Sequence, residues 1–412
     1  MTSRERVLAA LSHREPDVLP IDLGGTDVTS ILAPAYARLR RRLGCATGAI
    51  RLIMPDQFLP EIEPPVLDFA RADCLPIWFP AQGWVSSRLL SNEECVVPVE
   101  MAPERVEEGR WAIRGAGGEI SAVWSEGGSS FRSVTAPLAG AETVDDLVRH
   151  RAVISSLDAP GYASEDCQAL AKVARDSRRN SDRALVLHLG GHILAGGQSL
   201  MGYEKFMTDI LLNPRLVEAL LDRITETHIE RVEKYAQAVG DNVDVVYISD
   251  DLGAQNAPQL DPRLYRKIIK PRQAELCKAI RRKFNAFLML HTDGAVSEFI
   301  PDFIEMGIQA LNPVQVSAAG MEPAKLKREF GKDIAFWGGG CEGQKVLPFG
   351  TPEEVADEVK RRIDQLAPGG GFVFSHIHNM QPETPAENVV ALYEAAHRAS
   401  ATRFEIWPRE LN

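Results

Sequence analysis

Residues 286–294 read AFLMLHTDG, an apolar run that ends in His291, Thr292, Asp293 and Gly294. A short run that is apolar throughout is typical of a strand buried on both faces of a parallel sheet. Amphipathic segments at 262–283 and 296–306 flank the run and predict helices. A strand between two helices in this way indicates parallel pairing under helical cover.

Seven other runs have the same form, at 18–25, 73–80, 184–191, 244–253, 308–315, 334–340 and 371–378. Amphipathic segments also occur at 200–239, 322–330, 352–366 and 385–399. Eight such units predict an α/β fold, a closed (β/α)8 TIM barrel formed by residues 1–412 as a single domain. An open doubly wound sheet is the alternative, because no glycine fingerprint for phosphate binding after the first run decides between the two.

Residues 82–135 interrupt the pattern with short alternating runs joined by glycine-rich turns. They predict a small antiparallel β excursion after the second strand. This excursion contains Trp84, Trp111 and Trp124. It would be a lid, a dimer surface or a small subdomain that packs on itself.

Charge and cysteine content limit the class of protein. A formal net charge of -11 argues against nucleic acid and anionic membranes as partners. The first residues, MTSRERVLAALSHREP, lack the apolar core of a signal peptide, and no apolar stretch is long enough to predict a membrane span. Its six scattered cysteines form no Cys-x-x-Cys pair and suit a reducing cytoplasm.

A barrel of this kind carries its active site where the strands end, so the residues just past each run are the candidates. We expect catalysis from Asp250, Asp251, His291 and His378. The residues expected to bind substrate are Asp22, His188, His192, Asn312, Gln315 and His376.

The strand ends, which together form the mouth of the predicted barrel, are a candidate site for a divalent metal ion. His291 and Asp293 are two residues apart on one strand and share a face, as do His376 and His378 if their strand stays regular after Ser375. His291, Asp293 and His378 would form a His/carboxylate/His set for a divalent ion, with Cys341 as a softer fourth ligand. A metal-free acid/base cluster is the alternative.

Asp250 and Asp251 are neighbours in a strand and therefore point to opposite faces. At most one projects into the mouth, as a general base or to orient substrate. The other would cap the next turn or pair with a basic side chain.

The strand ends and the segments between them resemble the uroporphyrinogen decarboxylase superfamily over nearly the whole chain. The stretches that carry the resemblance include SRERVLAALSHREPDVLPIDLGG, ISDDLGAQNAPQLDPRLYRKIIKPRQ, LHTDG, IPDFIEMGIQALNPVQ, KLKREFGKDIAFWGGG, VLPFGTPEEVADEV and HNMQPETPAENVVALYEAAH. The chain is most similar to the branch that contains the cobalamin-dependent methyltransferases. The resemblance implies a distorted TIM barrel and a homodimer.

Two departures from the superfamily bear on the reaction. Haem-pathway decarboxylases grip porphyrinogen carboxylates with an arginine-rich segment, and this chain has LPIDLGGTDVTS there. Thiol-methylating relatives bind zinc through His-x-Cys and a later Cys, and this chain has Asp293 and His378 at the two cysteine positions.

The resemblance therefore implies a corrinoid-linked methyltransferase that does not methylate thiols. Zinc is the expected metal, a corrinoid protein carrying methylcobalamin the expected partner, and tetrahydrofolate or a methoxylated or methylamine-type compound the other reactant. A decarboxylase, lyase or metal-dependent hydrolase that acts on a small carboxylated or aromatic molecule is the second hypothesis. A ligand-binding protein without turnover is the third.

Overall fold

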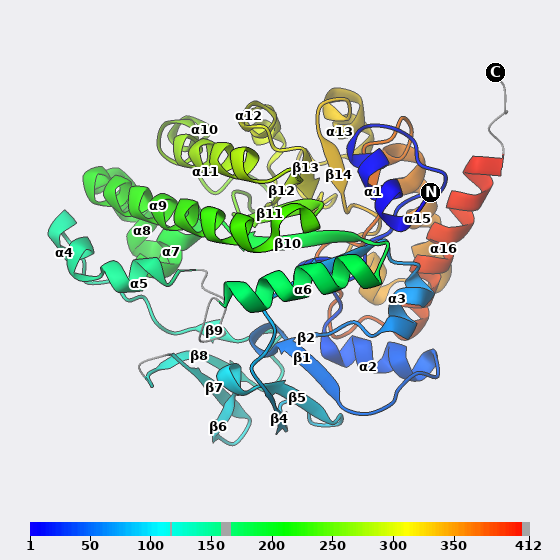
Figure 1. Ribbon diagram of the computed structural model, residues 1–412, viewed down its shortest axis with the longest axis horizontal. Helices are drawn as coiled ribbons and strands as arrows, with labels where there is room; N and C mark the ends of the chain where they lie inside the picture. Colours follow the sequence, from blue (N-terminus) through cyan, green and yellow to red (C-terminus); the bar gives the residue numbers. More distant parts are fainter. Residues whose placement is uncertain (116–117, 158–165, 406–412) are drawn as a thin grey trace.

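A computed structural model describes residues 1–115, 118–157 and 166–405 (Figure 1). Within these ranges the centre of the fold is a curled sheet of seven parallel strands in the order β15-β14-β13-β12-β11-β10-β3. The strands are β3 (Cys74–Ile77), β10 (Ala184–Gly190), β11 (Val245–Ser249), β12 (Phe287–His291), β13 (Ala310–Asn312), β14 (Ala335–Trp337) and β15 (Phe372–Val373). Each strand pairs with the next in the chain, without the reversal of order that defines a doubly wound sheet. The doubly wound alternative is therefore wrong.

The run at 18–25 forms no regular strand. Ile21 makes a single parallel bridge to Phe374 beside β15. On its other side, the carbonyl oxygen of Ile21 accepts a hydrogen bond from the backbone N–H of Asp73, which precedes β3. Pro20 has no N–H to donate and the chain turns at Gly24, so the segment is too short for a ladder. A closed barrel of eight strands is not confirmed.

Helices connect successive strands and cover the outside of the sheet, as Figure 1 shows for α6, α9 and α11. The connecting helices are α6 (Cys167–Asn180), α7 (Leu194–Met201), α8 (Tyr203–Leu212), α9 (Pro214–Val239), α10 (Pro262–Leu264), the π-helical turn η4 (Tyr265–Ile269), α11 (Lys270–Lys283), α12 (Ile300–Met306), α13 (Pro323–Phe330), α14 (Val346–Phe349), α15 (Pro352–Leu366) and α16 (Ala386–Glu405). Short 3₁₀ turns lie at η3 (Gly240–Asn242) and η5 (Ser297–Phe299).

Strand residues alternate between two apolar clusters. Leu185 and Leu187 of β10 belong to the large cluster under the helices, whereas Ala184 and Val186 belong to a smaller one on the inner face of the sheet. Helix α1 (Ser3–Leu11) adds apolar side chains to the inner cluster. It begins with a capping box formed by Thr2 and Glu5. The inner face is thus a packed core, and any site must lie at its rim.

The β-rich region is larger than the sequence suggests. It forms two four-stranded sheets, β2-β1-β5-β4 and β6-β7-β8-β9, which lie at the bottom of the view in Figure 1. Its strands are β1 (Ile50–Met54), β2 (Leu59–Pro60), β4 (Trp84–Ser87), β5 (Cys95–Pro98), β6 (Glu104–Glu107), β7 (Arg110–Arg114), β8 (Ile120–Ser125) and β9 (Arg132–Ser133). β5 pairs in parallel with β1, so the predicted excursion at 82–135 is joined to residues that precede β3. Residues 116–117 of that excursion lie outside the described residues.

The remaining elements are α2 (Ala33–Arg42), η1 (Pro55–Gln57), α3 (Pro64–Ala70), η2 (Val99–Met101), α4 (Val144–Arg149) and α5 (Arg151–Ser155). None of the helices in the described ranges combines the length and the apolar character needed to cross a bilayer.

Candidate functional site

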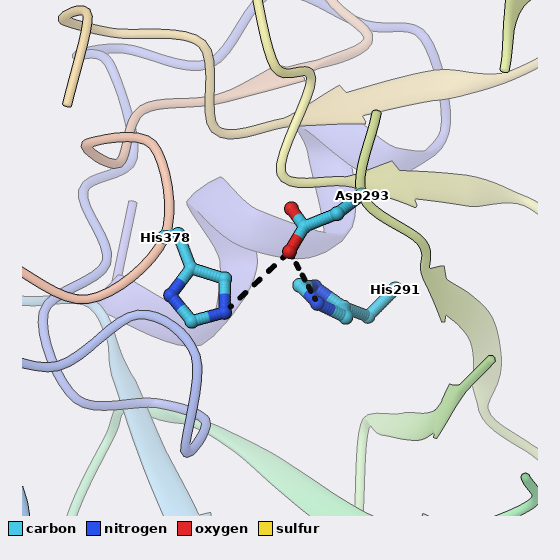
Figure 2. A group of neighbouring side chains, drawn as sticks. All are labelled: His291, Asp293 and His378. Carbon is cyan, nitrogen blue, oxygen red and sulfur yellow. Dashed lines mark ion pairs between the residues drawn. The ribbon is translucent and has the colours of Figure 1, made fainter. Parts of the chain in front are cut away.

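Three of the predicted metal ligands come together where β12 and β15 end. One ligand atom from each of His291, Asp293 and His378 lies within 4.8 Å of the other two. Asp293 Oδ2 is 3.8 Å from His291 Nε2 and 3.7 Å from His378 Nε2. Figure 2 shows the carboxylate between the two imidazoles.

Asn312 at the end of β13 fixes the tautomer of His291. Its side-chain Nδ2 donates to the carbonyl oxygen of Trp337 at 3.0 Å, so its Oδ1 faces His291 Nδ1 at 2.7 Å. An amide oxygen only accepts, so His291 Nδ1 carries the proton. In the neutral ring, Nε2 then presents a lone pair to the cluster, as a metal ligand or a general base requires.

His378 is in the opposite tautomer from His291. Its Nδ1 accepts a hydrogen bond from the backbone N–H of Asn379 at 2.7 Å. In the neutral ring the proton is then on Nε2, which faces Asp293. A metal bound through this nitrogen would take the place of that proton, and the hydrogen bond from Asn379 would have to break.

The backbone after β15 decides which histidine joins the cluster. The strand ends at Val373, and His378 has φ +56°, so strand alternation does not reach residues 376–378. His376 is fully buried, and its Nε2 lies 2.8 Å from the carbonyl oxygen of Ser30. The expectation that both imidazoles share one space is therefore wrong, because the chain leaves the extended conformation before them.

The spacing of the cluster fits a shared ion better than direct hydrogen bonds. Separations of 3.7 and 3.8 Å exceed hydrogen-bond length. Ligand atoms about 2.1 Å from a tetrahedral zinc ion lie about 3.4 Å from one another. His291 and Asp293 therefore fit a metal after a small closure of the site, whereas His378 fits once its Nε2 proton and the hydrogen bond from Asn379 are lost.

The adjacent aspartates have different environments. Asp250 is buried and accepts hydrogen bonds from the backbone N–H groups of Leu194 and Ala195, at the start of α7, and from Gln273 Nε2. Burial raises the pKa of Asp250 to about 6. Asp251 is half-exposed, and its Oδ1 lies 3.8 Å from His291 Nε2. Asp251 thus projects into the mouth and Asp250 caps a helix.

Asp22 occupies a closed environment beside the first run. It is fully buried and accepts hydrogen bonds from Trp337 Nε1 and the backbone N–H of Gly25, both at 2.8 Å. Burial raises the pKa of Asp22 to about 6 although both hydrogen bonds favour the charged form. These contacts give Asp22 a structural role.

The raised pKa of Asp22 gives a pH dependence of stability. The unfolded chain releases this proton near pH 4 and the folded chain near pH 6. The contribution of Asp22 to the free energy of unfolding therefore falls as pH rises through this window, by up to about 3 kcal/mol. We expect Asp22→Asn to lack this fall in urea unfolding between pH 4 and 7. Equal pH slopes in the two proteins would contradict the prediction.

The other predicted residues take different positions. Gln315 Oε1 accepts a hydrogen bond from the backbone N–H of Gly294 at 2.8 Å, which fixes the loop after Asp293. The ring of His188 lies 4.7 Å from that of Tyr247, and the Tyr247 ring lies 6.2 Å from that of His291 in the cluster. His192 is half-buried and close enough to Asp250 to offset a small part of the rise in pKa that burial causes there. Cys341 is buried, does not belong to the cluster, and has a thiol pKa raised well above its usual value by burial.

A pocket of about 430 Å³ opens beside the cluster. Asp293 and His378 line it together with Gln315, Gln344, Gln381, Asn379, Glu342 and Glu383. None of the described residues that line it is Lys or Arg. The pocket therefore presents carboxylates and amides, which favour a neutral or cationic ligand over an anionic one.

Sequence reasoning missed Asp27, Trp78 and Tyr247. Asp27 and Trp78 line a second pocket near the mouth, and the Asp27 charge helps to raise the pKa of the Tyr247 phenol. Asp27 lies in the turn-forming stretch GGTDVTS, and Tyr247 is the only polar side chain within the run VVYI. A polar aromatic residue inside a buried strand was the available signal.

Comparisons with known proteins agree on one family. The family model described as Uroporphyrinogen decarboxylase (URO-D) matches residues 189–399. A protein named uroporphyrinogen decarboxylase from Geobacter sulfurreducens is 24% identical over 187 residues, 45% of this chain and half the length of that relative. A protein of the same name from Anaeromyxobacter is 23% identical over 273 residues, 63% of this chain and 71% of that protein.

Among solved structures, a methyltransferase from Methanosarcina mazei matches with a TM-score of 0.58 at 17% sequence identity. The match covers 97% of this chain and 99% of the methyltransferase. At this identity the likeness concerns the fold.

Proposed function

The chain belongs to the uroporphyrinogen decarboxylase family, and from this premise we propose that it is an enzyme that moves a methyl group between a corrinoid and a small molecule. A partner protein would present the corrinoid as methylcobalamin. The other reactant would be tetrahydrofolate, another small acceptor, or a methoxylated or methylamine-type donor. The observation that carries the proposal is the cluster of His291, Asp293 and His378 at the rim of the sheet. The full-length likeness to a methyltransferase supports it.

A divalent ion, zinc above all, would be held by His291, Asp293 and His378 and would supply a Lewis acid for the group that gains or loses the methyl. Asn312 holds His291 with Nε2 toward that group. Asp251 accepts a hydrogen bond from the backbone N–H of Asp293 at 3.0 Å, which fixes the strand end. Its half-exposed carboxylate is placed to orient the substrate.

The chemistry of the metal ligands indicates which kind of compound gains or loses the methyl group. Zinc sites that activate thiolates are rich in thiolate ligands, and this cluster has two imidazoles and a carboxylate. Oxygen or nitrogen groups match such a harder site. We therefore propose a methylated oxygen or nitrogen compound rather than a thiol.

We expect the purified protein to catalyse at least one of two transfers. In one, the methyl group moves from methylcobalamin to tetrahydrofolate and leaves cob(I)alamin; in the other, it moves from a methoxyarene or a methylamine to added cob(I)alamin and leaves the phenol or the amine. The reaction is followed by the change in the visible spectrum of the corrinoid. A coenzyme-like thiol serves as the control acceptor and is expected to react more slowly. Failure of exchange with every reactant would exclude the proposed methyl transfer.

The tautomer of His378 favours a second candidate function. With its proton on Nε2, His378 is a donor beside the acceptor Nε2 of His291. Such a pair can protonate a carbanion or activate water without a metal, as in a decarboxylase, another lyase or a hydrolase. The names of the curated relatives point the same way. Release of carbon dioxide from a small carboxylated substrate, without corrinoid, would identify this activity.

We also propose that the enzyme is cytoplasmic and homodimeric. All six cysteines are free thiols, which supports a reducing compartment. The dimer rests on the family resemblance.

A further inference from the structure

A second pocket, of about 400 Å³, is lined in part by Asp27. Its wall includes Trp78 and Phe79 after β3, Trp84 of β4 and Arg51 of β1. Helix α6 contributes Val173 and Ser177. The pocket is therefore built from the barrel rim and the β-rich region together.

Two buried polar atoms of the pocket residues have no hydrogen-bond partner among the described residues: Asp27 Oδ1 and Trp78 Nε1. Asp27 is 9% exposed. A buried carboxylate oxygen without a partner costs free energy, and native proteins seldom leave one so. Trp78 Nε1 lacks an acceptor, and Asp27, whose side chain interacts with the Tyr247 hydroxyl, has room at Oδ1 for a further donor or a cation.

The charges around the pocket leave Asp27 uncompensated. The Arg51 guanidinium lies 3.3 Å from Glu61 and 5.7 Å from the ring of Trp84. Glu61 also lines the pocket, so these two charges offset each other at its rim. One carboxylate with indole and phenyl faces around it is the arrangement that binds organic cations.

A row of rings joins this pocket to the cluster. Centroid separations are 5.6 Å from Trp78 to His188, 4.7 Å from His188 to Tyr247, 6.2 Å from Tyr247 to His291 and 5.5 Å from His291 to His378. The rings of His188 and Tyr247 therefore lie between this pocket and the candidate reaction centre, and they connect the two.

We infer that this pocket binds the ammonium group of an organic cation, held by Asp27 and the faces of Trp78 and Trp84. The assignment of this cation as the methyl-bearing substrate rests on the proposed function, whereas the binding of the cation does not depend on it.

Binding of choline and of 3,3-dimethylbutan-1-ol tests the inference, because the two differ only in charge at nearly equal shape. The full-length protein is titrated with each and followed by calorimetry and by tryptophan fluorescence. We expect choline to bind about tenfold more tightly or better. Equal binding of the neutral alcohol, or tighter binding of the anion 3,3-dimethylbutanoate, would overturn the inference.

Asp27→Asn removes the charge with little change of shape and is expected to abolish the preference for choline. Asp176→Asn is the matched control: this residue lies on α6, pairs with Lys172 at 2.6 Å and does not line the pocket. It should leave the preference unchanged. A preference that survives in Asp27→Asn would refute the role of this pocket.

The two proposals fail in different ways. Choline selectivity without methyl exchange in any assay would refute the proposed function and leave the cation site standing. Methyl exchange without choline selectivity would refute the cation site and leave the proposed function standing.

Discussion

Replacing His291 by alanine is expected to remove the divalent ion from the purified protein and to lower the rate of methyl transfer by more than about 100-fold. The ring is buried and its Nε2 is held toward Asp293 by the hydrogen bond from Nδ1 to Asn312. No other side chain in the described cluster has a tautomer set for metal binding. Plasma mass spectrometry gives the metal content per chain, expected to be about one in the wild-type protein.

Asn312→Ala tests the orientation of the His291 ring separately from metal binding by the three ligands. It leaves all three ligands in place and frees the tautomer of His291, so metal affinity is expected to fall about 10- to 100-fold. His397→Ala is the control, because His397 lies on α16 with its Nε2 near the carbonyl oxygen of Ala70, away from the cluster. Wild-type protein that lacks metal would exclude the metal site and move the acid/base function ahead.

Alanine at the two adjacent aspartates is expected to give opposite results. Asp250→Ala leaves three donors without an acceptor, the buried ones from Leu194 and Gln273 and the partly buried one from Ala195, and should lower the free energy of unfolding by about 3–5 kcal/mol. Asp251→Ala removes a half-exposed side chain and one hydrogen bond to Asp293, which should cost about 1 kcal/mol.

Activity should follow the reverse order. Asp251→Ala is expected to lower kcat/KM by about tenfold or more, because the carboxylate beside His291 is lost. Asp250→Asn, which keeps acceptor capacity for the helix start, should retain most activity at temperatures where it stays folded. Urea unfolding and methyl-transfer kinetics measure both properties. Similar destabilisation in both alanine variants would contradict these assignments.

Much of the fold could be predicted because strand and helix periods are local. Seven of the eight apolar runs are strands of the parallel sheet, and the amphipathic segments between them are helices. The run at 18–25 forms no strand, because Pro20 and Gly24 leave too few residues for a ladder of hydrogen bonds. Ile21 makes only a single bridge. The β-rich region was placed too late in the chain, since the parallel partner of β5, at residues 50–54, gave no separate signal.

The candidate site, like the fold, could be predicted in part. From the pattern of residues alone, polar side chains were predicted to follow the strands and His291 and Asp293 to share a face, because both follow from a period of two and from parallel order. The packed fold was needed to show that His378 rather than His376 meets them, that Asp251 rather than Asp250 faces the mouth, and that Cys341 lies elsewhere. These outcomes depend on φ +56° at His378, on the helix start that Asp250 caps, and on burial. The helix start and the burial depend on contacts between segments distant in the chain, and the φ of His378 breaks the strand alternation on which the sequence pattern relies.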